Sequence, residues 1–188
     1  MRDKIKDLLL ESIQVKEDLL RNGIDNIIDI TNVMIDCLKK NGKVMILGNG
    51  GSASDAQHIA AELIGRFKKD RNGLPAIALT ANTSVLTSLA NDYGYDIVFA
   101  KQIEALGNKN DVVIGISTSG KAKNVALAIK QAKKMDIKTV ALTGGDGGEL
   151  AKLADVHLIV PSQVTARIQE AHITIGHIIC EIIEQTLC

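Results

Sequence analysis

The chain has 188 residues, 46% of them hydrophobic and 23% charged, which is an ordinary globular composition and enough for one domain with its own core. Lys and Arg together number 22, as do Asp and Glu, so no overall positive charge points to nucleic acid. With no Trp and only two Phe and two Tyr, the chain also offers few platforms on which bases could stack.

Membrane and redox signals are equally sparse. The N-terminal segment 1–7 has no apolar core of a signal peptide, and no apolar run approaches the roughly 20 residues that a membrane span needs. Cys37, Cys180 and Cys188 lie in or at the end of apolar helical runs and make no C-x-x-C pair. This pattern favours buried free thiols in a reducing compartment. We therefore expect a cytoplasmic protein that binds neither nucleic acid nor a membrane.

The first 40 residues are predicted to be helical, because apolar side chains recur at intervals of three and four. Asn22-Gly23 divides this segment into two helices, and Asn41-Gly42 ends the second. From residue 43 onward, short apolar runs alternate with helical patterns. The predicted strands are 44–47, 76–79, 112–116, 139–142 and 156–160, and the predicted helices are 53–65, 83–90, 96–106, 121–135 and 163–187.

Continuous apolar strands separated by helices indicate a parallel sheet that helices cover on both faces. With right-handed crossovers, the expected fold is a doubly wound, flavodoxin-like α/β sandwich with five strands, preceded by an N-terminal helical hairpin. The first and last helices are apolar over much of their circumference, which suggests burial on more than one side. We expect one domain over 1–188, in which 1–40 contributes to subunit packing and 43–188 forms the core, assembled as a homo-oligomer.

Two loops at helix starts are candidate phosphate sites. Gly48-Asn49-Gly50-Gly51-Ser52 follows the first strand, and Ser117-Thr118-Ser119-Gly120 follows the third. Glycines let the backbone approach a ligand, and hydroxyls with helix N-terminal N–H groups suit phosphate oxygens. An ordinary turn, with Ser52 or Ser54 capping the helix, explains the first loop equally well. Neither loop has the Gly-Lys-Ser/Thr of a P-loop, so nucleotide hydrolysis is not expected.

The helix after the first loop carries His58 and Glu62 one turn apart, a spacing that suits either a metal site or a surface pair. The last helix carries Gln169 and His177, eight residues and about 12 Å apart along the axis. They reach one ligand only if both side chains lean together, or a second subunit completes the site.

Two further polar segments are ambiguous. Asn91-Asp92-Tyr93-Gly94-Tyr95 is predicted as a polar break between two helices, which either faces the same site or forms a capped turn. The glycine-rich segment 144–148 is predicted to connect the fourth strand to a short helix rather than to bind an anion.

The segment Gly48-Asn49-Gly50-Gly51-Ser52-x-x-Asp55-Ala56-x-His58-x-x-x-Glu62, followed by Leu74-Pro75-Ala76-Ile77-Ala78-Leu79, resembles the sugar isomerase (SIS) domain family. Three more motifs, 91–94, 115–120 and 166–172, are similar to those of the phosphoheptose isomerases within that family. The resemblance runs over essentially the whole chain.

The resemblance implies an aldose–ketose isomerase that converts sedoheptulose 7-phosphate to D-glycero-D-manno-heptose 7-phosphate through an enediol. This is the first step towards the ADP- or GDP-activated heptoses of bacterial surface glycans, such as the lipopolysaccharide core. It also implies a homotetramer with one zinc ion per subunit. The implied metal ligands are His58, Glu62, Gln169 and His177, with Glu62 and His177 as the acid–base pair. The implied substrate contacts are Asn49, Gly50, Gly51, Ser52, Glu62, Asn91, Asp92, Ser117, Thr118, Ser119 and Gln169.

One position departs from the family pattern. The family commonly continues Ser-Thr-Ser-Gly with Asn-Ser, whereas this chain has Lys121-Ala122, so one hydroxyl expected at the phosphate is missing. Lys121 either replaces that hydroxyl with a charge or faces solvent.

The alternative function is a non-catalytic interaction protein of the same fold. Glu11-Ser12-Ile13-Gln14 is similar to a segment of the DnaA initiator-associating protein, a relative of the isomerases. That relative lacks the carboxylate that matches Glu62 and the imidazole that matches His177. This chain has both, which favours an enzyme. A phosphosugar-sensing domain of a regulator is disfavoured, because no helix-turn-helix module is evident before residue 40.

Overall fold

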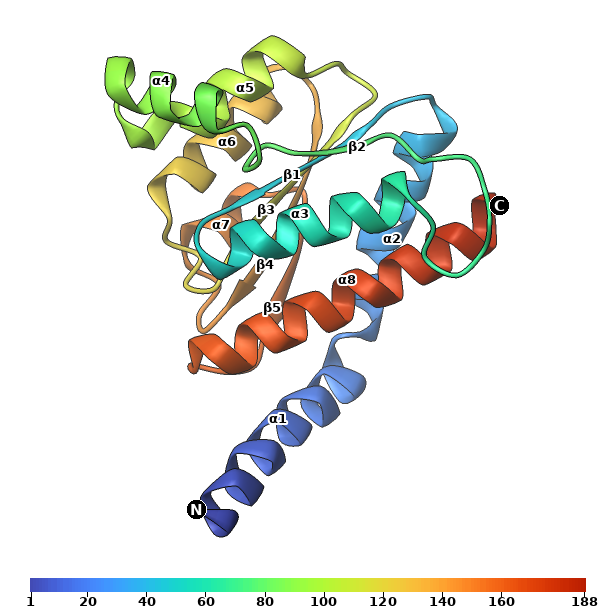
Figure 1. Ribbon diagram of the computed structural model, residues 1–188, viewed down its shortest axis with the longest axis vertical. Helices are drawn as coiled ribbons and strands as arrows, with labels where there is room; N and C mark the ends of the chain where they lie inside the picture. The colour runs from blue at the N-terminus through green and yellow to red at the C-terminus, as the bar shows by residue number, and fades with distance from the viewer.

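Five parallel strands form the centre of the computed structural model, which describes residues 1–188 (Figure 1). They are β1 (Val44–Gly48), β2 (Ala76–Ala78), β3 (Val112–Ser117), β4 (Lys138–Gly144) and β5 (Val156–Val160), in the order β2-β1-β3-β4-β5. Each neighbouring pair is parallel. The predicted doubly wound fold is therefore confirmed, because this strand order is the flavodoxin-like one.

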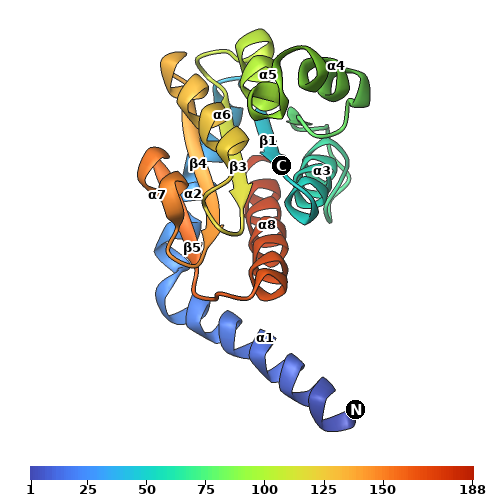
Figure 2. The same ribbon diagram turned by 90° about the vertical axis from the view of Figure 1, so that its left-hand side faces the viewer.

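Helices cover both faces of the sheet (Figure 2). Alternate residues of β1 explain why its sequence is apolar throughout, since Val44 and Ile46 join one core cluster while Met45 and Leu47 join the other. The first cluster includes side chains of α2 (Ile24–Lys39), α3 (Gly51–Ile64) and α8 (Thr165–Leu187). The second packs against α5 (Val98–Leu106), α6 (Lys123–Lys134) and α7 (Gly148–Leu153), with α4 (Thr83–Tyr93) at its margin.

The N-terminal helices differ from the predicted hairpin. α1 (Arg2–Asn22) ends where expected, but Gly23 keeps near-helical backbone angles (φ −108°, ψ −7°), and α2 begins at the next residue. A single residue in this conformation bends the chain without reversing it. α1 therefore projects away from the sandwich instead of folding back on α2 (Figure 1).

Several boundaries also differ from prediction by a few residues. α3 begins at Gly51, two residues early, and α4 continues to Tyr93, so residues 91–93 form its last turn and not a break. The predicted helix 96–106 is divided into a short 3₁₀ helix (Tyr95–Ile97) and α5. α7 begins at Gly148, which confirms that residues 144–148 connect β4 to a short helix.

The cysteines are all free, and two of the three are buried as expected. Burial raises the pKa of both Cys37 and Cys180 to about 12. Cys188 is exposed, so that part of the prediction is wrong: it is the last residue, beyond the packed part of α8. None of the helices combines the length and hydropathy needed to cross a membrane.

Candidate active site

The two candidate loops lie side by side at the carboxyl ends of neighbouring strands. Gly48 at the end of β1 is paired with Ile116 near the end of β3. The chain leaves β1 towards β2 on one side and β3 towards β4 on the other. Ligands of open α/β sheets bind at such a point, where the strand order reverses.

A pair of asparagines joins the first loop to the start of α6, the helix that follows the second loop. Asn49 and Asn124 exchange two side-chain amide hydrogen bonds, each 2.9 Å long, and Asn124 is buried. The Tyr95 hydroxyl also donates to Asn49 Oδ1 at 3.4 Å. Asn124 was not among the predicted site residues. It follows the hydroxyl loop closely, but a single Asn in the first turn of a helix does not by itself indicate a site.

The hydroxyl loop after β3 borders a cavity of about 240 Å³. Gly120 has φ +65°, and a Cβ there would collide with the carbonyl of Gly147, so the close approach of these two loops requires glycine. Eight residues line the cavity: Thr118, Ser119, Lys121, Gly145, Asp146, Gln163, Thr165 and Ile168. The segment 144–148 thus forms part of the cavity wall as well as a connection, which sequence reasoning missed.

Lys121 contacts an acid on the rim of this cavity. Its Nζ lies 3.3 Å from Asp146 Oδ2, with both side chains about two-thirds exposed. The backbone N–H of Gly148, followed by Lys121, lowers the pKa of Asp146. Lys121 thus lines the cavity and is largely exposed to solvent, with its charge paired to Asp146, so both alternatives for Lys121 stay open.

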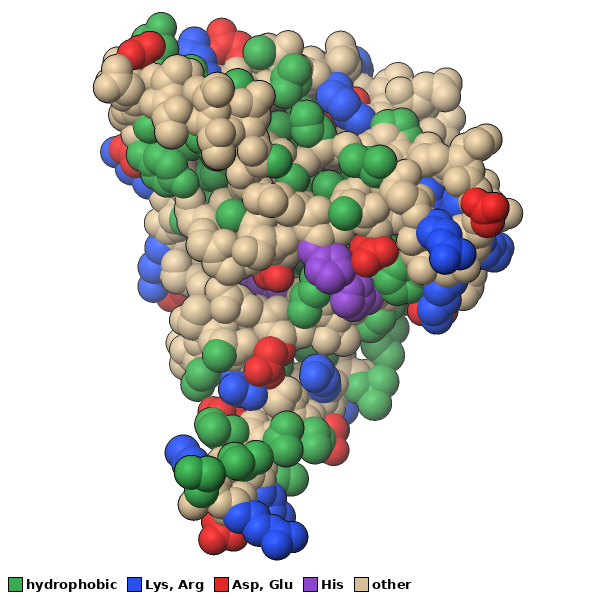
Figure 3. Space-filling model, in the orientation of Figure 1, with side chains coloured by type: hydrophobic (Ala, Val, Ile, Leu, Met, Phe, Trp, Pro, Cys, Tyr) green, Lys and Arg blue, Asp and Glu red, His purple; other side chains and the backbone are tan.

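Three donor side chains from α3 and α8 converge about one turn before the end of α3. His58 Nε2 lies 3.0 Å from Glu62 Oε1 and 3.2 Å from His177 Nε2. Ligand atoms of all three residues lie within 4.8 Å of one another. Histidine side chains gather beside a carboxylate in the middle of this face (Figure 3). The i, i+4 spacing of His58 and Glu62 on α3 was visible in the sequence. Their partner on α8, His177, is 119 residues away from His58.

Side-by-side packing of α3 and α8 brings these groups together. Gly176 lies against Ile59, where a Cβ would be 2.8 Å from the Ile59 side chain. Earlier on both helices, the Gln169 amide lies directly against Gly51. Gln169 and His177 therefore contact successive parts of α3, with Gln169 beside the first loop and His177 in the three-residue cluster.

Asp55 lies one turn before His58, and its Oδ2 atom is buried without a hydrogen-bond partner. Burial raises the pKa of Asp55 to about 6, and the charge of His58 opposes that rise. Asp55 belongs to the motif 48–62 that resembles the family, but we did not predict it as a site residue.

The remaining predicted site residues lie outside the cluster of His58, Glu62 and His177. Ser52 is buried and neither it nor Ser54 caps α3, so the capping alternative is wrong, since Gly50 occupies that position. Ser117 is buried at the end of β3, whereas Thr118 and Ser119 reach the cavity. Asn91 and Asp92 hydrogen-bond each other at 2.9 Å on the exposed last turn of α4. No hydrogen bond joins them to the other site residues.

Comparison with known proteins gives a consistent result. Residues 9–144 match the family model described as SIS domain. The phosphoheptose isomerase of Aquifex aeolicus is 50% identical over 188 residues, covering 100% of this chain and 98% of that protein. The phosphoheptose isomerase GmhA from Neisseria gonorrhoeae has a TM-score of 0.93 at 44% identity and 98% coverage of both chains. A phosphoheptose isomerase from Francisella tularensis has a TM-score of 0.94 at 41% identity and 97% coverage of both. None of these relatives favours the non-catalytic alternative.

Proposed function

The chain belongs to the SIS domain family, among its phosphoheptose isomerases, and we propose that His58, Glu62 and His177 form its catalytic centre. It is an aldose–ketose isomerase that interconverts sedoheptulose 7-phosphate and D-glycero-D-manno-heptose 7-phosphate in heptose biosynthesis. The observation that carries the proposed centre is the convergence of an acid, a base and a second imidazole from α3 and α8. We further propose that residues 1–188 are one SIS domain.

Isomerisation moves one proton from C1 to C2 and another between the two oxygens, so it needs a base at carbon and an acid at oxygen. In the proposed roles, Glu62 removes the proton from C1 and returns it at C2 of the enediol. His177 gives a proton to the carbonyl oxygen and takes one from the other hydroxyl. The atoms balance without any further reactant, since substrate and product are isomers.

The cluster also fits the proposed zinc ion. Two donor atoms on a tetrahedral zinc ion, each at about 2.0–2.2 Å, lie about 3.3–3.6 Å apart. The 3.2 Å and 3.0 Å separations in the cluster are close to that spacing. His58, Glu62 and His177 would hold the ion, and a bound divalent ion would stabilise the negative charge that develops on the substrate oxygen.

Gln169, whose amide lies beside Gly51, is the proposed fourth metal ligand. It binds the ion where its side chain and that of His177 lean together, or a second subunit completes the site. In its observed place, Gln169 suits the proposed substrate contact with the loop Asn49–Ser52. The roles of Asn91 and Asp92 as substrate contacts are proposed from the family resemblance alone.

We propose that the 240 Å³ cavity holds the phosphate, with Ser117 at the strand end behind Thr118 and Ser119. Two hydroxyls and Lys121 supply donors and positive charge there. The phosphate is at the opposite end of the sugar from the reacting carbons C1 and C2. Binding it orients those carbons at the acid–base pair, and the binding energy so contributes to catalysis. Thr165 at the cavity and His177 are twelve residues, roughly 18 Å, apart along α8, which supports a site completed between subunits.

The proposed assembly is a homotetramer. Large apolar side chains are exposed along α1, at Ile5, Leu8, Leu9, Leu10, Ile13 and Leu20. An apolar cavity of about 310 Å³ lies between α1, α2 and α8. Exposed apolar surface of this extent is typical of interfaces. We also propose a cytoplasmic location and a product that enters the synthesis of surface glycans such as the lipopolysaccharide core.

The direct test is to incubate the purified protein with sedoheptulose 7-phosphate, with and without added zinc, and to follow the aldoheptose phosphate by NMR. Conversion to the aldose is expected, and it should be fastest with zinc. No conversion under either condition, by folded protein, would contradict the proposal.

A further inference from the structure

A buried ion pair connects the ends of the two helices that carry the catalytic cluster. Arg71 lies in the loop 65–75 between α3 and β2, and Glu184 lies in the last turn of α8. Arg71 Nε donates to Glu184 Oε2 at 3.0 Å, and the two side chains are only 4% and 2% exposed. A pair this deep in the protein persists only when its remaining donors and acceptors are also satisfied.

Arg71 uses its other nitrogens on the end of α3. Its Nη2 donates to the Glu62 carbonyl oxygen at 2.9 Å, and its Nη1 donates to the Leu63 carbonyl oxygen at 2.8 Å. The last carbonyls of a helix have no partner within the helix, so a side chain can satisfy them. The rigid guanidinium fork suits several acceptors at once. The peptide group of the proposed base, Glu62, is therefore held directly by Arg71.

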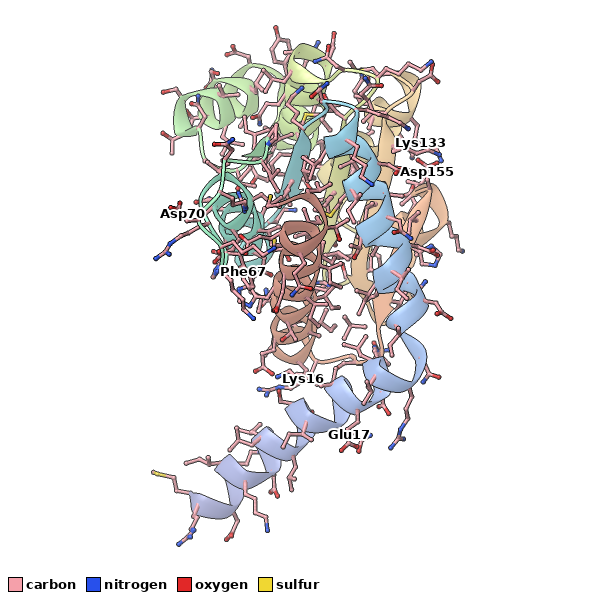
Figure 4. All side chains as sticks on the ribbon, turned by 90° about the vertical axis from the view of Figure 1, so that its right-hand side faces the viewer. Lys16, Glu17, Phe67, Asp70, Lys133 and Asp155 are labelled. Carbon is pink, nitrogen blue, oxygen red and sulfur yellow. The ribbon has the colours of Figure 1, made fainter.

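Glu184 fixes the loop against the other catalytic side chain. Its carboxylate accepts the backbone N–H groups of Phe67, Lys68 and Lys69, at 3.0, 2.8 and 2.7 Å. Burial alone would raise the pKa of Glu184, but these donors and Arg71 lower it to about 2, so the carboxylate is ionised. The loop then presents the Phe67 ring to His177, with ring centroids 5.8 Å apart. Figure 4 shows Phe67 beside α8.

We propose that Arg71 and Glu184 are positioning residues of the isomerase, which fix the backbone of Glu62 on α3 relative to the ring of His177 on α8. The proposal rests on the proposed roles of Glu62 and His177 as the acid–base pair. Neither Arg71 nor Glu184 touches the reacting atoms. They act through the Glu62 carbonyl and through Phe67.

The same loop and helix offer a matched control. Lys68 Nζ contacts Glu181 Oε1 at 2.7 Å, a pair that also joins loop 65–75 to α8. This pair is exposed, with side chains 61% and 36% accessible. Lys68 Nζ also lies 5.8 Å from the centroid of the Phe67 ring, a contact that is weak at an exposed site. Lys68→Ala keeps the backbone N–H groups of Phe67, Lys68 and Lys69 that Glu184 binds, and the bond from Arg71 to the Glu62 carbonyl. Lys68→Ala should therefore leave the catalytic geometry unchanged.

The test compares Arg71→Lys and Glu184→Gln with Lys68→Ala in the full-length protein, after thermal unfolding has shown which variants fold. Arg71→Lys keeps the charge but loses the fork, and Glu184→Gln keeps the shape but loses the charge. Misplacement of about 1 Å costs up to roughly 10²-fold in rate, so we expect kcat to fall about 10- to 100-fold. KM should change little, because other loops form the phosphate cavity, and the pH profile of kcat should shift. Lys68→Ala should match the wild type.

A second measurement does not depend on activity. The chain has four histidines, so the His177 ring signals can be assigned in NMR spectra of the zinc-free protein by comparison with His177→Gln. Loss of the Phe67 ring from its place should move these signals in Arg71→Lys and Glu184→Gln, but not in Lys68→Ala. Inactive wild-type protein would overturn the proposed function, while these signals would still report on positioning.

Folded Arg71→Lys and Glu184→Gln with the kcat, pH profile and His177 signals of the wild type would overturn the inference. If neither variant folds, Phe67→Leu tests the same connection, because it leaves the ion pair intact and removes only the ring. It should move the His177 signals and lower kcat, and unchanged values in Phe67→Leu would overturn the inference.

Discussion

His58 Nε2 and His177 Nε2 lie 3.2 Å apart, although 119 residues separate them in the chain. Two neutral imidazoles this close cannot both carry their proton on the facing nitrogen, so at least one presents a lone pair. Glu62 Oε1 lies 3.0 Å from the same His58 nitrogen. The arrangement therefore suits a shared cation, either a proton or a metal ion.

The first prediction concerns the metal. Chelation should suppress isomerase activity, and zinc should restore it. His58→Ala should weaken zinc binding by more than the roughly 10- to 100-fold typical of outer-shell changes, because it removes a donor atom. A zinc titration measures this, with His157→Ala on β5 as the control, since His157 is not part of the cluster. Full activity in verified metal-free protein would remove the metal from the mechanism.

The second prediction concerns the phosphate cavity. Lys121→Ala should raise KM for sedoheptulose 7-phosphate and leave kcat nearly unchanged, because it removes charge that binds substrate and transition state alike. Ala122→Ser should lower KM by restoring the hydroxyl common in the family. Lys123→Ala is the control, since Lys123 is paired with Asp96 outside the cavity. An unchanged KM in Lys121→Ala would show that this lysine serves only its ion pair with Asp146.

The sequence predicted the fold well because its signals are local. Apolar runs such as Val44–Leu47 and Val112–Ile116 mark buried strands whatever surrounds them, and both were confirmed. The hairpin prediction failed because Asn22-Gly23 signals a helix end but not a direction. The angle was decided by the backbone of Gly23, which stayed nearly helical.

The site was predictable only in part, for the same reason. His58 and Glu62 share one helix turn, so their spacing is visible in the sequence. The approach of His177, the Asn49–Asn124 amide pair and the Arg71–Glu184 pair are long-range contacts. They depend on how α3, α6 and α8 pack, and no local pattern encodes that. The resemblance to a family grouped His177 with His58 and Glu62, but nothing in the sequence indicated the other two pairs.

The third prediction concerns acid stability. His172 is fully buried, and its Nε2 lies 3.1 Å from the Thr143 carbonyl oxygen while Nδ1 has no partner. Burial lowers the pKa of His172 to about 4, although the hydrogen bond with Thr143 opposes this. The unfolded chain, with a pKa of 6.5, therefore binds a proton more readily than the folded one. The stability that the protein gains from a neutral His172 is fully present above about pH 6.5, and it is lost as the pH falls towards about 4.

This loss amounts to roughly 3 kcal/mol, since each pKa unit corresponds to about 1.4 kcal/mol. The free energy of unfolding should be measured by denaturant titration between pH 7 and pH 4, in the wild type and in His172→Phe. The variant should show a flatter pH dependence. An identical slope in both proteins would mean that other groups cause the acid sensitivity.

The fourth prediction concerns assembly. Light scattering should give the mass of a tetramer for the wild type. Leu20→Glu should reduce that mass, because Leu20 is 69% exposed and lines the apolar cavity between α1, α2 and α8. Glu17→Gln on the same helix should not, as Glu17 is outside that cavity. A monomeric wild-type protein would contradict the proposed assembly.

The central claim is that Glu62 is the base at carbon, and one comparison tests it most directly. The turnover of sedoheptulose 7-phosphate should be measured for the wild type, Glu62→Gln and the surface control Glu181→Gln, all saturated with zinc. General-base catalysis contributes about 10²- to 10⁴-fold, so Glu62→Gln should fold normally and lose turnover by at least that range, while Glu181→Gln should not. Turnover at the wild-type rate in Glu62→Gln would contradict the account.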